Sequence, residues 1–121
     1  MKVLSVDDAK SVHSFLKMCL SGTDVDLAHA YSGEEALAIL IGDSKTEFDL
    51  ILLDWEMPGL TGPDVLVKLK EANLTTPVIM LTSRNKPEDI MKILELGAVE
   101  YIMKPFTQDL IQEKINSVMG A

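Results

Sequence analysis

The fold is constrained most strongly by residues 50–62, which read Leu-Ile-Leu-Leu-Asp-Trp-Glu-Met-Pro-Gly-Leu-Thr-Gly. An unbroken apolar run that stops at turn residues is typical of a strand buried on both faces, as in a parallel sheet. Pro58 and Gly59 favour a turn, because proline fixes φ and glycine admits conformations closed to other residues. Asp54 is therefore expected at the carboxyl end of a central strand, the edge at which open α/β sheets bind ligands.

The rest of the chain alternates between strand and helix patterns. Short apolar runs predict five strands, at residues 3–6, 25–30, 48–53, 77–81 and 99–103. Apolar residues at helical spacing predict helices near residues 9–20 and 33–42, from residue 63, at 88–96 and after 106, with a polar loop at 43–47. Five alternations predict an α/β fold, a parallel sheet covered by helices on both faces.

Local signals refine this pattern. Ser32 is expected to cap the second helix and to form a capping box with Glu35, three residues later. Gly97 is a plausible end for the fourth helix. The apolar periodicity assigns Phe15 to the buried face of the first helix and Leu94 to that of the fourth.

Composition excludes several classes of partner and location. The chain has 121 residues, enough for one domain, and a formal net charge of −8, which argues against binding to nucleic acid or to anionic membranes. The single cysteine, Cys19, excludes an internal disulfide and fits a reducing compartment. No signal-peptide core and no apolar run of ~20 residues is present, so a cytoplasmic location is expected.

Four predicted strands end in polar residues of particular types, namely Asp7-Asp8, Asp54, Thr82 and Lys104. Parallel strands point the same way, so these residues should converge on one edge of the sheet. Three carboxylates in one site repel each other, and a hard divalent cation such as Mg²⁺ relieves that repulsion. The lysine and the threonine hydroxyl can hold further anionic oxygens. Together these groups describe a phosphoryl-transfer site that forms an acyl phosphate.

Each of these residues also has a purely structural interpretation when taken alone. The Asp7-Asp8 pair could cap the first helix, and Asp54 could be a turn residue. Thr82 could be a helix cap, and Lys104 a solvated loop charge. The functional interpretation rests on finding all of them in order at four strand ends.

These motifs resemble the receiver domain of the two-component response regulators, and the chain is similar to the single-domain chemotaxis type. The resemblance covers the whole chain, from Val-Leu-Ser-Val-Asp-Asp at residues 3–8, through Asp-Trp-Glu-Met-Pro-Gly at 54–59 and Thr-Ser at 82–83, to Tyr-Ile-Met-Lys-Pro-Phe at 101–106. It implies a single receiver domain over residues 1–121. The implied fold is a flavodoxin-like, doubly wound (βα)5 arrangement whose five-stranded parallel sheet has strand order 2-1-3-4-5.

The resemblance also implies a phosphorylation chemistry. Asp54 would be the phosphoacceptor, receiving a phosphoryl group from the phosphohistidine of a sensor histidine kinase. Asp8, Asp54 and the backbone carbonyl of Glu56 would ligate Mg²⁺, and Asp7 would assist through a metal-bound water. The domain would then be a signalling switch that catalyses only its own phosphorylation and dephosphorylation.

The switch itself is implied by three further positions. Lys104 would contact the phosphoryl group, and the bond from Lys104 to Pro105 is expected to be cis. Thr82 would move toward the phosphoryl oxygen, and Tyr101 would change rotamer with it. The output would be a changed surface made by the fourth helix, the fifth strand and the last helix, which controls an unidentified partner, with chemotaxis or motility as one candidate process. The protein would be a monomer or a phosphorylation-dependent dimer.

Two positions vary in the family and tune its rates. Glu56 and Arg84 lie two residues beyond the acceptor and the switch threonine. Their opposite charges could pair across the mouth of the site and slow the approach of water.

Three polar residues are given no catalytic role. Ser5 stands in the first strand where the family usually has an aliphatic residue, and this departure places no role in doubt. His13 on the first helix and His29 in the second strand lack the spacing of metal ligands.

Three other functions compete with the receiver. A phosphatase with an aspartate nucleophile is expected to carry Asp-x-Asp, whereas Asp54-Trp55-Glu56 leads into a turn, and the chain is short for a substrate-selecting cap domain. A receiver-like module that never takes phosphate would lack one of the acidic residues or the lysine. A nucleotide-binding protein would need a glycine-rich loop after the first strand, where Asp7-Asp8-Ala9-Lys10 stands instead.

Overall fold

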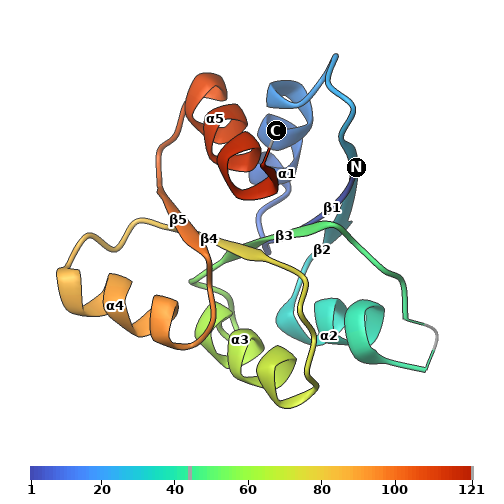
Figure 1. The fold of residues 1–121 in the computed structure, drawn as a ribbon, viewed down its shortest axis with the longest axis vertical. Helices are drawn as coiled ribbons and strands as arrows, with labels where there is room; N and C mark the ends of the chain where they lie inside the picture. Colours follow the sequence, from blue (N-terminus) through green and yellow to red (C-terminus); the bar gives the residue numbers. More distant parts are fainter. Residues whose placement is uncertain (44, 121) are drawn as a thin grey trace.

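The computed structural model describes residues 1–43 and 45–120, in which strands and helices alternate strictly (Figure 1). The strands are β1 (Lys2–Val6), β2 (Asp26–Ala30), β3 (Leu50–Asp54), β4 (Val78–Thr82) and β5 (Glu100–Met103). The helices are α1 (Lys10–Cys19), α2 (Gly33–Ile41), α3 (Gly62–Glu71), α4 (Pro87–Glu95) and α5 (Gln108–Met119). Every predicted element forms, with bounds that differ from the prediction by at most two residues.

The strands form one parallel sheet in the order β2-β1-β3-β4-β5. The predicted fold class and strand order are confirmed. β3 occupies the centre, between β1 and β4, and all five of its residues are buried, as its apolar run predicts. Asp54 is the last residue of β3, opposite Leu81 of β4, so the strand includes the carboxylate that was expected just beyond it.

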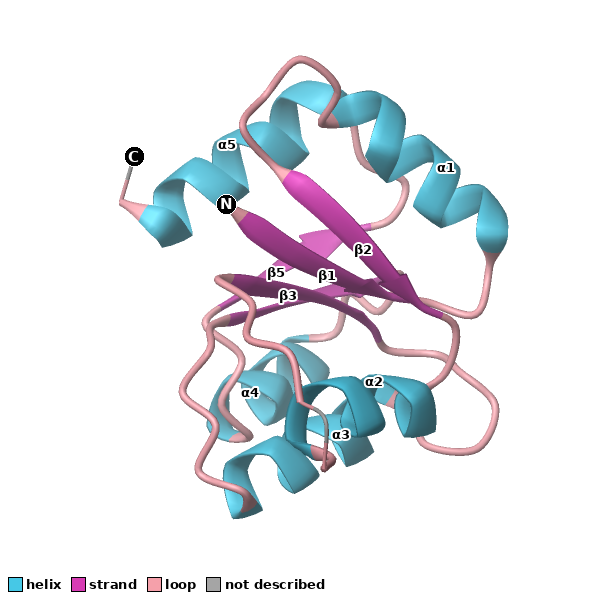
Figure 2. Ribbon diagram, turned by 90° about the vertical axis from the view of Figure 1, so that its right-hand side faces the viewer, coloured by secondary structure: helices cyan, strands magenta, loops and turns pink. Residues whose placement is uncertain are grey.

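The helices cover both faces of the sheet. Figure 2 shows α1 and α5 on one face and α2, α3 and α4 on the other. Alternate residues of β3 serve the two faces, because successive side chains of a strand point in opposite directions. Ile51 and Leu53 pack in the cluster under α2, α3 and α4, whereas Leu50 and Leu52 pack in the cluster under α1 and α5. Each of these fully buried side chains contributes about 1.5 to 3 kcal/mol to stability.

The capping prediction is correct in one half only. The Ser32 hydroxyl accepts from the Glu35 amide at 3.0 Å, but the Glu35 carboxylate accepts from the amide of Tyr31 instead of that of Ser32. A complete capping box occurs at α3, where Thr61 and Asp64 accept from each other's amides. The hydrogen bonds from Thr61 hold the pKa of the Asp64 carboxyl below its usual range.

Two residues assigned to buried helix faces lie at the surface. Phe15 is 37% exposed and lies against Phe106, with ring centroids 5.5 Å apart. Leu94 is 44% exposed on α4. The sheet covers only a narrow strip of each helix, so residues at the margin of an apolar face remain at the surface. Cys19 is buried, and burial raises the pKa of its thiol.

The predicted loop at 43–47 contains neither helix nor strand at residues 43 and 45–47, and Ser44 lies outside the described residues. None of the helices in residues 1–43 and 45–120 has the length and apolar character needed to cross a membrane.

Gly62, the first residue of α3, permits a close approach to the end of β3. A Cβ placed there would lie 2.5 Å from the backbone oxygen of Asp54 and 3.0 Å from Cα of Trp55. We expect Gly62→Ala to destabilise the fold by about 1 to 3 kcal/mol, because the backbone of Asp54 and Trp55 must move away from α3 to make room. Urea denaturation measures this change, and an unchanged unfolding midpoint would show that the loop yields without cost.

Candidate functional site

The carboxyl ends of four strands bring the predicted site residues to one edge of the sheet. Asp7 and Asp8 follow β1, Asp54 ends β3, Thr82 ends β4 and Lys104 follows β5. The register explains the convergence, since Val6 pairs with Leu53, Asp54 with Leu81, and Thr82 with Met103.

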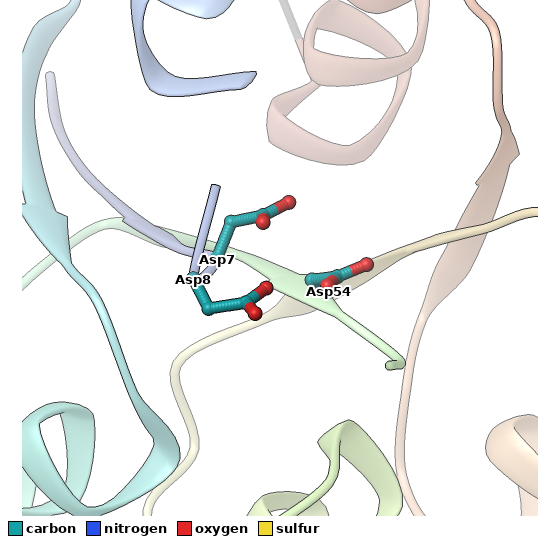
Figure 3. A group of neighbouring side chains, drawn as sticks. All are labelled: Asp7, Asp8 and Asp54. Carbon is teal, nitrogen blue, oxygen red and sulfur yellow. The ribbon is translucent and has the colours of Figure 1, made fainter. Parts of the chain in front are cut away.

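Three carboxylates form an acidic cluster at this edge. Figure 3 shows Asp7 and Asp8 at the end of β1 extending to the same side as Asp54 of β3. Ligand oxygens of the three lie within 4.8 Å of one another. Asp7 and Asp54 are 1% and 4% exposed, whereas Asp8 is exposed. The cluster therefore has two buried carboxylates and one that opens to solvent.

Lys104 joins the two buried carboxylates. Its Nζ donates to Oδ1 of Asp54 at 2.7 Å and to Oδ2 of Asp7 at 3.2 Å. The peptide bond from Lys104 to Pro105 is cis, as the resemblance implies. Lys104 is therefore an ion-pair partner within the site, and the interpretation as a solvated loop charge is wrong.

The electrostatics of the site reflect burial and crowding. The pKa of Asp54 rises to about 6, first because burial penalises the ionised form and then because Asp7 and Asp8 add negative charge nearby, while Lys104 opposes the rise. Burial alone would lower the pKa of Lys104, but the hydrogen bond to Asp54 and the charges of Asp54 and Asp7 raise it above its usual value. The site thus holds one ammonium against three carboxyl groups.

Asp7 performs a structural task as well as lying in the cluster. Its Oδ1 accepts from the amide of Ala9 at 2.9 Å, just before α1, while its Oδ2 faces Lys104. The interpretation of Asp7-Asp8 as a helix cap is wrong, because Ala9 is the N-cap of α1 and no side chain among the described residues caps this helix. The bond to Ala9 instead closes a turn before the helix and leaves the second oxygen of Asp7 free to face Lys104.

Thr82 and Tyr101 lie on the neighbouring strands β4 and β5. The buried Thr82 hydroxyl accepts from the amide of Arg84 at 2.9 Å, which closes a turn, and α4 begins only at Pro87. Tyr101 is half-buried and packs against the cluster under α2, α3 and α4. Thr82 thus ends β4 at the carboxyl edge of the sheet, whereas Tyr101 lies further back along β5, opposite Met80.

Glu56 and Arg84 form the ion pair that their charges suggest. Nε of Arg84 lies 2.7 Å from Oε1 of Glu56, and Nη1 lies 3.8 Å from Oδ2 of Asp89 on α4. The Arg84 guanidinium also lies 4.6 Å from the ring of Trp55, a cation–π contact. Hydrogen bonding to Glu56 raises the pKa of Arg84. The pair links the loop after β3 to the loop before α4.

The donor set fits a hard divalent cation. Such cations prefer carboxylate oxygens, and the cluster offers oxygens from three aspartates within 4.8 Å. A cation would also balance the negative charge that Lys104 leaves uncompensated.

Sequence reasoning missed a buried polar group next to the cluster. His13, 3% exposed, hydrogen-bonds the backbone carbonyl of Asp7, the Ser5 hydroxyl and the ring of His29. Two signals pointed to it: a serine inside an apolar strand, and a histidine on the same face of a helix as Leu16. Neither signal identified the other as its partner.

The sheet and the acidic edge define a class of protein, the flavodoxin-like domains with a carboxylate site at the carboxyl ends of the strands. Within it, the chain belongs to the response regulator receiver domain family, whose model matches residues 3–116. The domain is accordingly a signalling switch of two-component systems, and a phosphoacceptor role is general for this family.

Relatives and solved structures agree with that assignment. The chain is 41% identical over 118 residues to the transcriptional regulatory protein CpxR of Klebsiella pneumoniae, matching 98% of this chain and 49% of that protein. It is 35% identical over 121 residues to the chemotaxis protein CheY of Pseudomonas aeruginosa, at 98% and 95% coverage. The receiver domain of the Francisella response regulator 1452 superposes with a TM-score of 0.90 at 33% identity, covering 98% of this chain and 96% of that one.

These matches differ in extent. The chain spans about half the length of the transcriptional regulator and nearly all of the chemotaxis protein. The chain therefore shares with CpxR only the half that matches, and any activity of the other half of CpxR belongs to that protein.

Proposed function

We propose that residues 1–121 form a single receiver domain that takes a phosphoryl group from a sensor histidine kinase onto Asp54 in a Mg²⁺-dependent reaction. One observation carries this proposal. The Asp54 carboxylate lies at the end of the central strand, with Lys104 at 2.7 Å on one oxygen and two further carboxylates within reach of a shared cation.

The chemistry follows from the carboxylate and the lysine. An oxygen of ionised Asp54 attacks the phosphorus of a phosphohistidine; the new O–P bond forms as the P–N bond breaks, and the imidazole leaves with the bonding pair. With a pKa of about 6, Asp54 is mostly ionised at neutral pH. Lys104 already donates to Asp54 and can continue to stabilise the negative charge when that charge moves from the carboxylate to the phosphoryl oxygens.

The metal would be held by the acidic cluster. Asp8, Asp54 and the backbone carbonyl of Glu56 would ligate Mg²⁺, with Asp7 acting through a bound water. When bound, Mg²⁺ neutralises the charge that gathers on the carboxylates and the transferred group. The contribution of the chain is to keep the carboxylates close together in a partly buried site.

The switch would act through Thr82 and Tyr101. To reach a phosphoryl oxygen, the Thr82 hydroxyl must give up its hydrogen bond from the Arg84 amide, which loosens the turn before α4. Tyr101 would then move inward. We propose that the output partner binds α4, β5 and α5, where Met91 is 60% exposed and Leu94 is 44% exposed.

Trp55 offers a direct test. It is 4% exposed, follows Asp54 in the chain and lies beneath Arg84, so changes at the site should alter its fluorescence. We expect quenching on titration with Mg²⁺, and a second change after acetyl phosphate or beryllofluoride is added. A flat signal, together with no acid-labile phosphate by mass spectrometry, would contradict the proposal and indicate a constitutive interaction module.

The kinase would dock beside the site. An apolar hollow of about 510 Å³ lies between α1 and the loop after β5, lined by Phe15, Pro105, Phe106 and, next to the acidic cluster, Lys104. A partner that delivers a phosphohistidine to Asp54 must approach this edge of the sheet. The partly exposed Phe15 is positioned to contact it.

We expect Phe15→Ala to slow phosphotransfer from a histidine kinase that phosphorylates the wild-type chain by about tenfold, because interface aromatics carry much of the binding energy. Uptake from acetyl phosphate, which needs no docking surface, should stay unchanged. Equal rates from the kinase for both proteins would exclude Phe15 from the docking surface.

The Glu56–Arg84 pair would lengthen the lifetime of the phosphorylated state. Because the two side chains meet across the mouth of the site, we propose that they slow the approach of water to the acyl phosphate. Glu56→Ala and Arg84→Ala should each raise the dephosphorylation rate severalfold, measured as decay of the phosphorylated mass. An unchanged decay rate in both variants would refute this role.

A further inference from the structure

We infer that His13 is a positioning residue that holds the Asp7–Asp8 peptide in the orientation required for binding a divalent cation. Its Nε2 lies 2.7 Å from the backbone oxygen of Asp7. The inference rests on the proposed function, because it assigns a supporting residue to the acidic cluster of the same site.

His13 is enclosed between α1 and the sheet. It is 3% exposed and shares the buried face of α1 with Leu16 and Cys19. Its ring meets those of His29 and Tyr31 edge-on, with centroids 4.5 Å and 4.8 Å away. The imidazole is thus packed against two aromatic rings as well as hydrogen-bonded to Asp7.

The partners of the ring decide which nitrogen carries a proton. A backbone carbonyl oxygen only accepts hydrogen bonds, so Nε2 of His13 must be protonated and must donate to Asp7. Nδ1 lies 3.0 Å from the Ser5 hydroxyl and 2.9 Å from Nδ1 of His29. Ser5, the unusual polar residue of β1, therefore helps to hold the ring from its other nitrogen.

The hydrogen bond acts on the peptide that carries the metal-binding pair. The carbonyl of Asp7 belongs to the peptide bond that joins Asp7 to Asp8, and the amide of Asp7 is held separately by the oxygen of Ala30 at 3.1 Å. Among the described residues, none hydrogen-bonds the exposed Asp8 carboxylate. Its place in the cluster therefore depends on its backbone, which His13 fixes from α1.

The Ser5–His13 contact is not a nucleophilic site. Both side chains are almost completely buried, at 1% and 3% exposure, so no substrate can reach the hydroxyl. The imidazole acts on the acidic cluster only through the peptide, as outer ligands of metal sites orient the inner ones.

A series of substitutions at His13 tests the inference. The amide nitrogen of a glutamine can replace Nε2 as a donor to Asp7, whereas leucine offers no donor and asparagine is too short. We expect His13→Leu and His13→Asn to weaken Mg²⁺ binding about tenfold or more in the Trp55 titration, and His13→Gln to retain most of the affinity. The matched control is Ser14→Gln on the exposed face of α1, which leaves His13 and its bond to Asp7 intact and should bind Mg²⁺ like the wild type.

Two outcomes would overturn the inference without touching the proposed function. One is a wild-type protein that binds Mg²⁺ and becomes phosphorylated while His13→Leu binds Mg²⁺ equally well. The other, which needs no variant to fold, is a two-bond ¹H–¹⁵N spectrum of the wild type showing His13 without a proton on Nε2. A wild type that neither binds Mg²⁺ nor takes phosphate would instead refute the proposed function.

Discussion

Replacing Asp54 with asparagine should abolish phosphorylation of this protein. The amide has no negative oxygen with which to attack phosphorus, and no other described residue places a buried carboxylate at 2.7 Å from Lys104. Intact-mass spectrometry after incubation with acetyl phosphate and Mg²⁺ should show one added phosphoryl group on the wild type and none on Asp54→Asn. The phosphoryl-dependent change in Trp55 fluorescence should disappear with it.

The control for this experiment is Asp26→Asn. Asp26 is exposed at the start of β2, away from the carboxyl edge, so the variant has the same change of charge without altering the site. It should be phosphorylated like the wild type. An Asp54→Asn protein that still gains a phosphoryl group would show that the acceptor is another residue and would overturn the assignment.

Asp54→Asn should also stabilise the fold in the absence of divalent cations. Burial raises the pKa of Asp54 to about 6, from 3.8 for an ordinary aspartate, so the folded protein holds a proton that the unfolded chain releases. Between these two values the free energy of unfolding falls as pH rises, by about 2 to 3 kcal/mol in total. An asparagine side chain cannot ionise, so Asp54→Asn should exceed the wild type in stability by about that amount above pH ~7.

Urea denaturation as a function of pH checks the sign. The advantage of Asp54→Asn should be largest above pH ~6 and should vanish below pH ~4, where the carboxyl is protonated in both states. Asp26→Asn should show no such pH-dependent gain. An Asp54→Asn protein less stable than the wild type at neutral pH would mean that the ion pair with Lys104 outweighs the cost of burying the carboxylate.

The sequence was sufficient to predict the sheet, because the strand signals agree with one another. β3 is a continuous apolar run, and burial on both faces is the only environment that such a run fits well in a small α/β domain. Once its neighbours are parallel, the meeting of Asp7, Asp54 and Lys104 at one edge follows from topology.

Features that depend on distant contacts could not be predicted. Whether Phe15 is covered depends on how far α5 extends over α1, which no local pattern encodes. The hydrogen bond from His13 to the Asp7 carbonyl requires a particular rotation of α1 against β1. The Ser5 hydroxyl meets its partner, Nδ1 of His13, only when the helix packs in that way. The full capping box at Thr61 was missed because an aspartate takes the place of the usual glutamate or glutamine.

The separation of the apolar interior into two clusters, one on each face of the sheet, makes the two helical layers independently variable. Substitutions in different layers share few neighbours, so their effects on folding should add. A lineage can therefore alter the residues of α4 while leaving the packing of α1 and α5 unchanged. The central strands β1, β3 and β4, whose side chains belong to both layers, are the elements with the least freedom to change.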